Sequence, residues 1–89
     1  KNALCLYTAI IHCQQMVQNF HGKISINELI SEAGRIIDSF PGCIAEYIQV
    51  VDRQSLQECH ELDQNSVLAL AVKVGGKVRL IDNAVLMDQ

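Results

Sequence analysis

The segment from Val67 to Asn83 reads VLALAVKVGGKVRLIDN and decides the fold. Before Gly75-Gly76 the larger residues Leu68, Leu70 and Val72 alternate with alanines, and after it Val78 and Leu80 alternate with Lys77 and Arg79, which predicts two β-strands. Adjacent glycines tolerate the positive φ angles of a tight hairpin turn. We therefore expect an antiparallel hairpin, with its core face formed by Leu68, Leu70, Val72 and Val74 opposite Val78 and Leu80.

The polar end of this segment has two interpretations. Arg79 lies opposite Leu80 in the alternation, so it should meet solvent, pair with a carboxylate across the sheet, or contact another domain. We expect Asp82 and Asn83 to end the strand, where such side chains commonly bond nearby backbone groups. Strand position should aim Arg79 and Asp82 away from the helix-covered face. Strand termination is the favoured interpretation, and contact with a ligand or a second domain is the alternative.

Another strand is predicted upstream, at residues 45–52 (AEYIQVVD). Its β-branched residues alternate, with Ile48 and Val50 on one face. Residues 52–66 are polar and lack a period, which predicts a loop with Leu56 and Leu62 as isolated anchors and one possible helical turn after Asp52.

Two amphipathic helices are predicted before the strands. The first runs from Ala3 to Phe20, with Gly22 available for the left-handed conformation that closes a helix. The second should begin at a capping box formed by Ser25 and Glu28 and end before Pro41-Gly42. The expected buried stripes are Leu6, Ile10, Cys13, Val17 and Phe20 in the first helix, and Ile26, Leu29, Ile30, Ala33, Ile37 and Phe40 in the second.

The predicted order is helix, helix, strand, strand, strand, which is typical of the α+β class. We expect two helices packed on one face of a small, mainly antiparallel three-stranded sheet, with the position of the first strand left open. The 89 residues are enough for one domain, residues 1–89, and not for two.

Composition excludes several classes of function. A net charge of −3 with scattered Lys and Arg argues against nucleic acid or an anionic membrane surface as a partner. The sequence lacks a membrane-spanning apolar run and the pattern of a signal peptide, so we expect a cytoplasmic protein. Because Lys1 falls within a helical pattern without a Met or a capping residue, we also expect an upstream part to have been removed.

Candidate reactive groups do not form a recognisable site. Cys5, Cys13, Cys43 and Cys59 have no CxxC spacing, and we expect free thiols without bound metal. His12, His21 and His60 are expected to serve packing or to lie in exposed loops. The Gly-Gly-Lys sequence lies between strands and not before a helix, so it is no phosphate loop. The loop carboxylates Glu58, Glu61 and Asp63 match no calcium loop.

Three segments resemble the C-terminal domain of the pantothenate synthetase (pantoate-β-alanine ligase) family. They are ALCLYTAI, EYIQVVDRQSLQEC and, above all, LALAVKVGGKVRLIDN, in the family's order and at about its spacing. The resemblance covers essentially the whole chain. One departure is the hairpin at residues 75–78, which is a residue longer than the family often shows.

The resemblance implies an enzyme that uses ATP and Mg²⁺ to activate pantoate as pantoyl adenylate and then condenses it with β-alanine. It implies an N-terminal nucleotide-binding domain as partner, with the HIGH-like motif, the catalytic lysine and the Ser-Arg-Asn segment outside this sequence. The present chain would be a lid that binds no cofactor by itself, and no catalytic, substrate-binding or metal residue is assigned to it. A homodimer of the full-length protein is possible. The alternative is a noncatalytic ligand-sensing or protein-interaction module.

Overall fold

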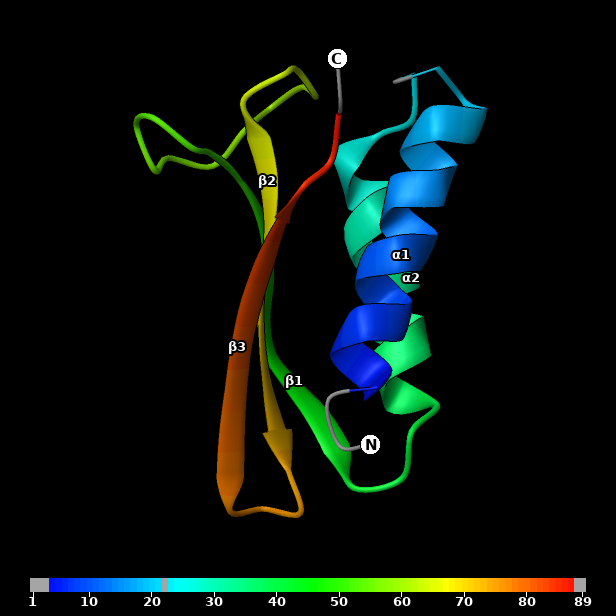
Figure 1. Ribbon diagram of the computed structural model, residues 1–89, viewed down its shortest axis with the longest axis vertical. Helices are drawn as coiled ribbons and strands as arrows, with labels where there is room; N and C mark the ends of the chain where they lie inside the picture. Colours follow the sequence, from blue (N-terminus) through cyan, green and yellow to red (C-terminus); the bar gives the residue numbers. More distant parts are fainter. Residues whose placement is uncertain (1–3, 22, 88–89) are drawn as a thin grey trace.

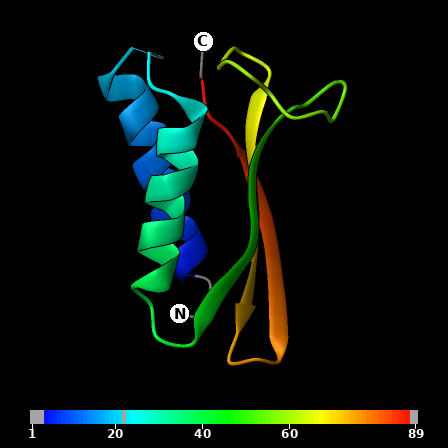
Figure 2. The ribbon, with the colours of Figure 1, turned by 180° about the vertical axis from the view of Figure 1, so that it is seen from behind.

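Two helices lie side by side against one face of a three-stranded sheet (Figure 1). The computed structural model describes residues 4–21 and 23–87. The elements are α1 (Leu4–Asn19), α2 (Ile26–Asp38), β1 (Cys43–Asp52), β2 (Ser66–Val74) and β3 (Val78–Val85). The view from behind places α2 in front of α1 (Figure 2). The predicted α+β arrangement is confirmed.

The sheet has the order β1-β2-β3 with both pairings antiparallel, so the first strand occupies the edge beside β2. The predicted hairpin is confirmed: Val74 pairs with Val78, and Val72 pairs with Leu80. Gly75 and Gly76 have φ angles of 62° and 70°, which a residue with a Cβ would adopt only under strain. The Lys77 amide donates to the Val74 carbonyl at 3.2 Å and closes the turn.

The core lies between the helices and the inner face of the sheet. Its fully buried sheet residues include Leu68, Leu70 and Val72 of β2, as predicted. Val74 and Leu80 pack against this core from positions nearer the hairpin. Val78, which was predicted to share this face, is exposed because it lies beside the turn, where the hairpin extends past the helices (Figure 1).

Helix α1 buries the predicted residues Leu6, Ile10, Cys13 and Val17, together with Cys5 and Ala9. The prediction for Phe20 was wrong: it is exposed, because α1 ends at Asn19 and Phe20 belongs to the turn that follows. His21 adopts the positive φ of 54°. The predicted left-handed Gly22 lies outside the described residues.

The capping box of α2 is confirmed. The Glu28 amide donates to Ser25 Oγ at 3.0 Å, and the Ser25 amide donates to Glu28 Oε1 at 3.4 Å. The buried stripe contains Leu29, Ala33 and Ile37 as predicted, and also Ile36. The other predicted members are only partly buried at the margin of the core: Ile26, Ile30 and Phe40.

The loop after β1 is ordered by Asp52 and contains the single helical turn considered there, because the Leu56 amide donates to the Asp52 carbonyl at 2.7 Å. The Asp52 carboxylate accepts the amides of Gln54 at 2.8 Å and Ser55 at 3.1 Å. These bonds, first that from Ser55, lower the pKa of Asp52. Leu56, predicted as an anchor, is instead 75% exposed with a φ of 63°, because this tight turn carries its side chain away from the core. Leu62 packs against the core as predicted.

The predicted strand end at Asp82 and Asn83 was wrong. Strand β3 continues to Val85 because β2 offers pairing partners up to there: Asp82 pairs with Leu70 and Asn83 with Ala69. Asp82 therefore lies on the same face as Leu80, toward the helices, although it is exposed at the sheet edge. The prediction that Arg79 and Asp82 both point away from the helices is therefore confirmed for Arg79 and wrong for Asp82.

Within residues 4–21 and 23–87, no helix combines the length and the apolar character needed to cross a membrane.

Candidate functional site

Arg79 forms an ion pair on the outer face of the sheet. Its Nε donates to Glu46 Oε1 at 2.6 Å, which links β3 to β1 across the central strand. Glu46 lies at a register shift between Ala45 and Tyr47, so it is an extra residue in β1. Of the roles considered for Arg79, the structure shows pairing with a carboxylate across the sheet. The Arg79 guanidinium is therefore engaged in a structural contact.

Arg79→Ala is expected to lower the free energy of unfolding by no more than about 1 kcal/mol, since both partners are partly exposed and water screens the pair. Urea unfolding of Arg79→Ala, Glu46→Ala and the double variant measures the coupling. Arg35→Ala, which removes a similar exposed pair with Glu32, is the matched control. A loss above about 3 kcal/mol would show that the pair behaves as a buried one.

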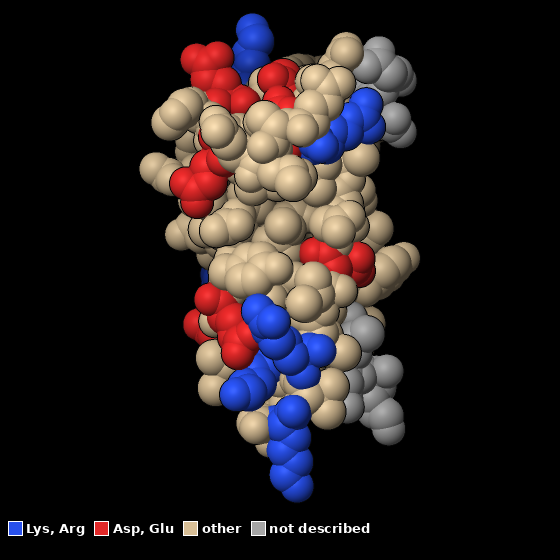
Figure 3. Space-filling model, turned by 90° about the vertical axis from the view of Figure 1, so that its left-hand side faces the viewer, with Lys and Arg blue, Asp and Glu red and all other residues tan. Residues whose placement is uncertain are grey.

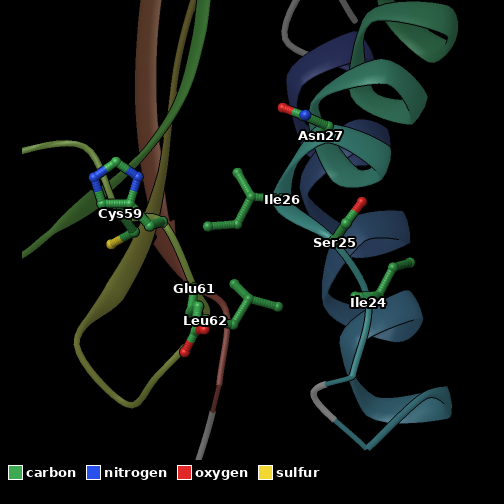
Figure 4. Close-up of a pocket in the computed structure, with 8 residues that line it drawn as sticks. Ile24, Ser25, Ile26, Asn27, Cys59, Glu61 and Leu62 are labelled. Atoms are coloured by element: carbon green, nitrogen blue, oxygen red, sulfur yellow. The ribbon is translucent and has the colours of Figure 1, made fainter.

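A hollow of about 540 Å³ lies between the start of α2 and the loop after β1. Figure 4 places Ile26 and Leu62 between the two sides, with Cys59 and Glu61 on the loop. The lining residues are Ile24, Ser25, Ile26, Asn27, Cys59, His60, Glu61 and Leu62. It is a concave surface to consider as a binding site.

The polar groups of this hollow already have structural roles. Ser25 Oγ caps α2, and Cys59 Sγ accepts a weak hydrogen bond from Ser66 Oγ at 3.7 Å. A serine or cysteine nucleophile needs a base within hydrogen-bond reach. Ser25 Oγ and Cys59 Sγ bond with Glu28 and Ser66, so neither hydrogen bond supplies a histidine base. Among the described residues, no group of three or more His, Cys, Asp or Glu could hold a metal ion. The hollow therefore offers no assembled catalytic group.

The loop carboxylates form the wall of a second, shallower hollow of about 370 Å³. Asp63 Oδ1 accepts the Asn65 amide at 2.8 Å, so it shapes the turn before β2. Glu58 forms an isolated bridge with Val51 through the backbone. Asp63 thus has a structural role through its carboxylate, whereas the bridge of Glu58 involves only its backbone.

Glu32 connects the two helices electrostatically. Arg35 Nε donates to Glu32 Oε1 at 2.7 Å, and His12 Nε2 of α1 lies 3.9 Å from the same oxygen. The hydrogen bond from Arg35 lowers the pKa of Glu32, and the charge of His12 contributes in the same direction. No pattern along the chain indicated this contact, which is the role the structure assigns to His12.

The four cysteines form no disulfide. Cys5 and Cys13 are fully buried, whereas Cys43 and Cys59 are partly exposed. Burial raises the pKa of Cys13 to about 11. Burial, and then a hydrogen bond with Cys43, raises the pKa of Cys5 to about 11. Since the thiolate is the nucleophile, both buried thiols are unreactive at neutral pH.

We expect thiol titration of the unfolded chain without reductant to find four reactive thiols. In the native protein Cys5 and Cys13 should react much more slowly than Cys59, because burial shields them and keeps them protonated. Mass spectrometry after timed alkylation assigns each site, and elemental analysis of the same sample detects metal. A smaller thiol count or stoichiometric zinc would contradict the prediction.

Comparison with known proteins places the chain in a family. A sequence model described as Pantoate-beta-alanine ligase matches residues 1–85. The chain belongs to this family. It is 36% identical over 88 residues to the pantothenate synthetase of Trichlorobacter lovleyi, a match that covers 99% of this chain and 30% of the relative. It is 39% identical over 89 residues to that of Desulfotalea psychrophila, covering 96% of this chain and 30% of the relative.

The chain thus spans about 30% of the length of the curated relatives it matches, and it corresponds to the C-terminal domain of pantoate-β-alanine ligases. A crystal structure of pantothenate synthetase from Thermus thermophilus has the same fold, with a TM-score of 0.79 and 20% identity. That match covers 94% of this chain and 29% of the solved one. The resemblance inferred from the three sequence segments is confirmed.

Proposed function

We propose that this chain is the lid domain of an ATP-dependent pantoate-β-alanine ligase. The observation that carries the proposal is the family match over residues 1–85 together with coverage of about 30% of the relatives' length. In the proposed reaction, the pantoate carboxylate attacks the α-phosphorus of ATP and expels pyrophosphate. The amine of β-alanine then attacks the acyl carbon of pantoyl adenylate and expels AMP, which leaves pantothenate.

The role proposed for this domain is to close over a site built by an N-terminal nucleotide-binding domain. An acyl adenylate is hydrolysed by water, so closure protects the intermediate and holds the partners in place. Stabilising the transferring phosphate requires positioned cations and backbone donors. Arg79 and Arg35 are held by carboxylates at the surface of this domain, so these two cations are engaged, and we place ATP and Mg²⁺ on the other domain.

A chimera tests this function. This chain should replace the matching 30% of the Trichlorobacter lovleyi relative, and the chimera should form pantothenate and AMP from pantoate, β-alanine and Mg-ATP. The relative truncated before the matching segment is the background control. We expect activity well above that background, because a lid of the same family restores closure. A folded chimera with no more activity than the truncated protein would contradict the proposal.

Two parts of the proposal have separate measurements. The isolated chain should show no saturable binding of Mg-ATP or pantoate at micromolar concentration in calorimetry, and saturable binding would place a ligand site within it.

We further propose a cytoplasmic location, which fractionation of cells that express the protein would test. The possible homodimer of the full-length protein would be measured by light scattering.

A further inference from the structure

Helix α1 carries a second apolar stripe on the side away from the core. Leu4, Tyr7 and Ile11 are spaced by three and four residues, so they share one face of the helix. Leu4 is 50% exposed and Tyr7 is 64% exposed, while Ile11 is partly buried. The opposite face of α1 is already buried against α2 and the sheet. The N-terminal half of the helix is therefore apolar on two sides.

The same helix has no Lys, Arg, Asp or Glu from Leu4 to Asn19. Its exposed polar residues are neutral, among them Gln15 and Gln18. A helix that faces water normally carries charges on its outer side, whereas one that is apolar all round is normally buried. The composition of α1 thus fits a helix that is covered on both sides.

Helix α2 provides an internal comparison because it lies in the same layer (Figure 2). Its exposed residues include Glu28, Arg35 and Asp38, and its buried residues form a single stripe. This is the usual pattern of a helix between a core and water. The difference shows that the uncharged outer face of α1 is not a general property of this helical layer.

The outer face of the sheet also has exposed apolar residues, namely Ile44 at 65%, Ile81 at 58% and Val85 at 40%. Near the hairpin, however, this face carries the Arg79–Glu46 ion pair and Lys73 on the strand between them. Figure 3 shows Lys and Arg side chains next to Asp or Glu side chains near the lower end of this face. Burying an ion pair costs desolvation energy, so the sheet face is the poorer docking surface.

The size of the stripe favours a covalently linked partner. A stable interface between free proteins usually buries about 800 Å² on each side, which three side chains on one helix do not provide. Domains joined in one chain associate through smaller surfaces because the linker keeps their effective concentration high. The curated relatives contain such a linked partner, since the segment like this chain makes up about 30% of their length.

We propose that Leu4, Tyr7 and Ile11 form the surface on which this domain docks against the remainder of the ligase polypeptide. The inference rests on the proposed function for the identity of the partner, and it specifies the docking face. Closure would then bring α1, and not the sheet, against the nucleotide-binding part. The partner surface is expected to be apolar and uncharged where it meets these three side chains.

Photo-crosslinking in the chimera tests the docking face. Tyr7→p-benzoylphenylalanine places the reactive group on the stripe. Ile81→p-benzoylphenylalanine is the matched control on a residue of the sheet with similar exposure, 58% against 64%. After irradiation, mass spectrometry should find a crosslink within one chain from position 7 to the relative's segment, and none from position 81. Fragment masses identify the residues that are joined.

Three results would overturn the docking proposal: a crosslink from position 81 in place of position 7, a crosslink from position 7 that joins two copies, or none from position 7. The readout does not depend on turnover. An inactive chimera that crosslinks from position 7 would refute the ligase function and keep the docking face. An active chimera that fails to do so would refute the docking face alone.

Discussion

Leu70→Ala is expected to lower the free energy of unfolding by about 2 to 5 kcal/mol, the range for a leucine deleted from a well-packed core. Leu70 is fully buried in the middle of the central strand, where it is paired with Ile48 of β1 and Asp82 of β3. Because strands on both sides hold the backbone at this position, the cavity left by the substitution cannot collapse easily. Urea unfolding followed by circular dichroism measures the change.

Ile81→Ala is the matched control for this substitution. It removes methyl groups of comparable volume from the neighbouring strand, but its side chain is 58% exposed on the outer face. We expect a loss of less than about 1 kcal/mol, as is usual for surface substitutions. Equal losses for the two variants would show that the outer face of the sheet is as tightly packed as the core.

Stability should fall steeply as the pH rises from 9 to 11. Burial raises the pKa of Cys13 from its ordinary value of 9.0 to about 11, and burial raises the pKa of Cys5 in the same way. Below pH 9 both thiols are protonated in the folded and the unfolded chain, so their full contribution to the free energy of unfolding is present. Above it the unfolded chain loses these protons first, which favours unfolding by up to about 1.4 kcal/mol per pH unit for each thiol.

Urea unfolding at pH 8 and at pH 10.5 measures this alkaline loss. Cys13→Ala should reduce the loss by roughly half, whatever its effect on stability at pH 8, because one of two titrating buried thiols is removed. Cys59→Ala is the control, since Cys59 is only partly buried. If the free energy of unfolding falls by the same amount for Cys13→Ala and for the parent between pH 8 and pH 10.5, ionisation of Cys13 does not cause the loss of stability at high pH.

Local sequence patterns were enough to predict the helices and strands and their order along the chain. The Gly75-Gly76 turn, the Ser25 capping box and the periods of the helices and strands each depend on residues a few positions apart. Such signals act before any tertiary contact forms, so they can be interpreted along the chain. The family resemblance was carried by the same local segments.

Contacts between residues that are far apart in the sequence could be identified only from the tertiary structure. The Arg79–Glu46 pair spans 33 positions and depends on the register shift in β1. The contact of His12 with Glu32 depends on how the two helices pack. Reasoning from the sequence assigned no site residue, and no spacing along the chain could have identified these pairs.

Burial at the ends of elements was likewise decided by packing. Phe20 and Leu56 are apolar, yet a turn carries each away from the core, while Asp82 and Asn83 stay in β3 because β2 continues to pair with them. The sequence by itself determined the type and order of the helices and strands and which face of each is apolar, but not where each element ends. Only the tertiary structure decided what covers each face, because burial depends on neighbours that are brought together from distant parts of the chain.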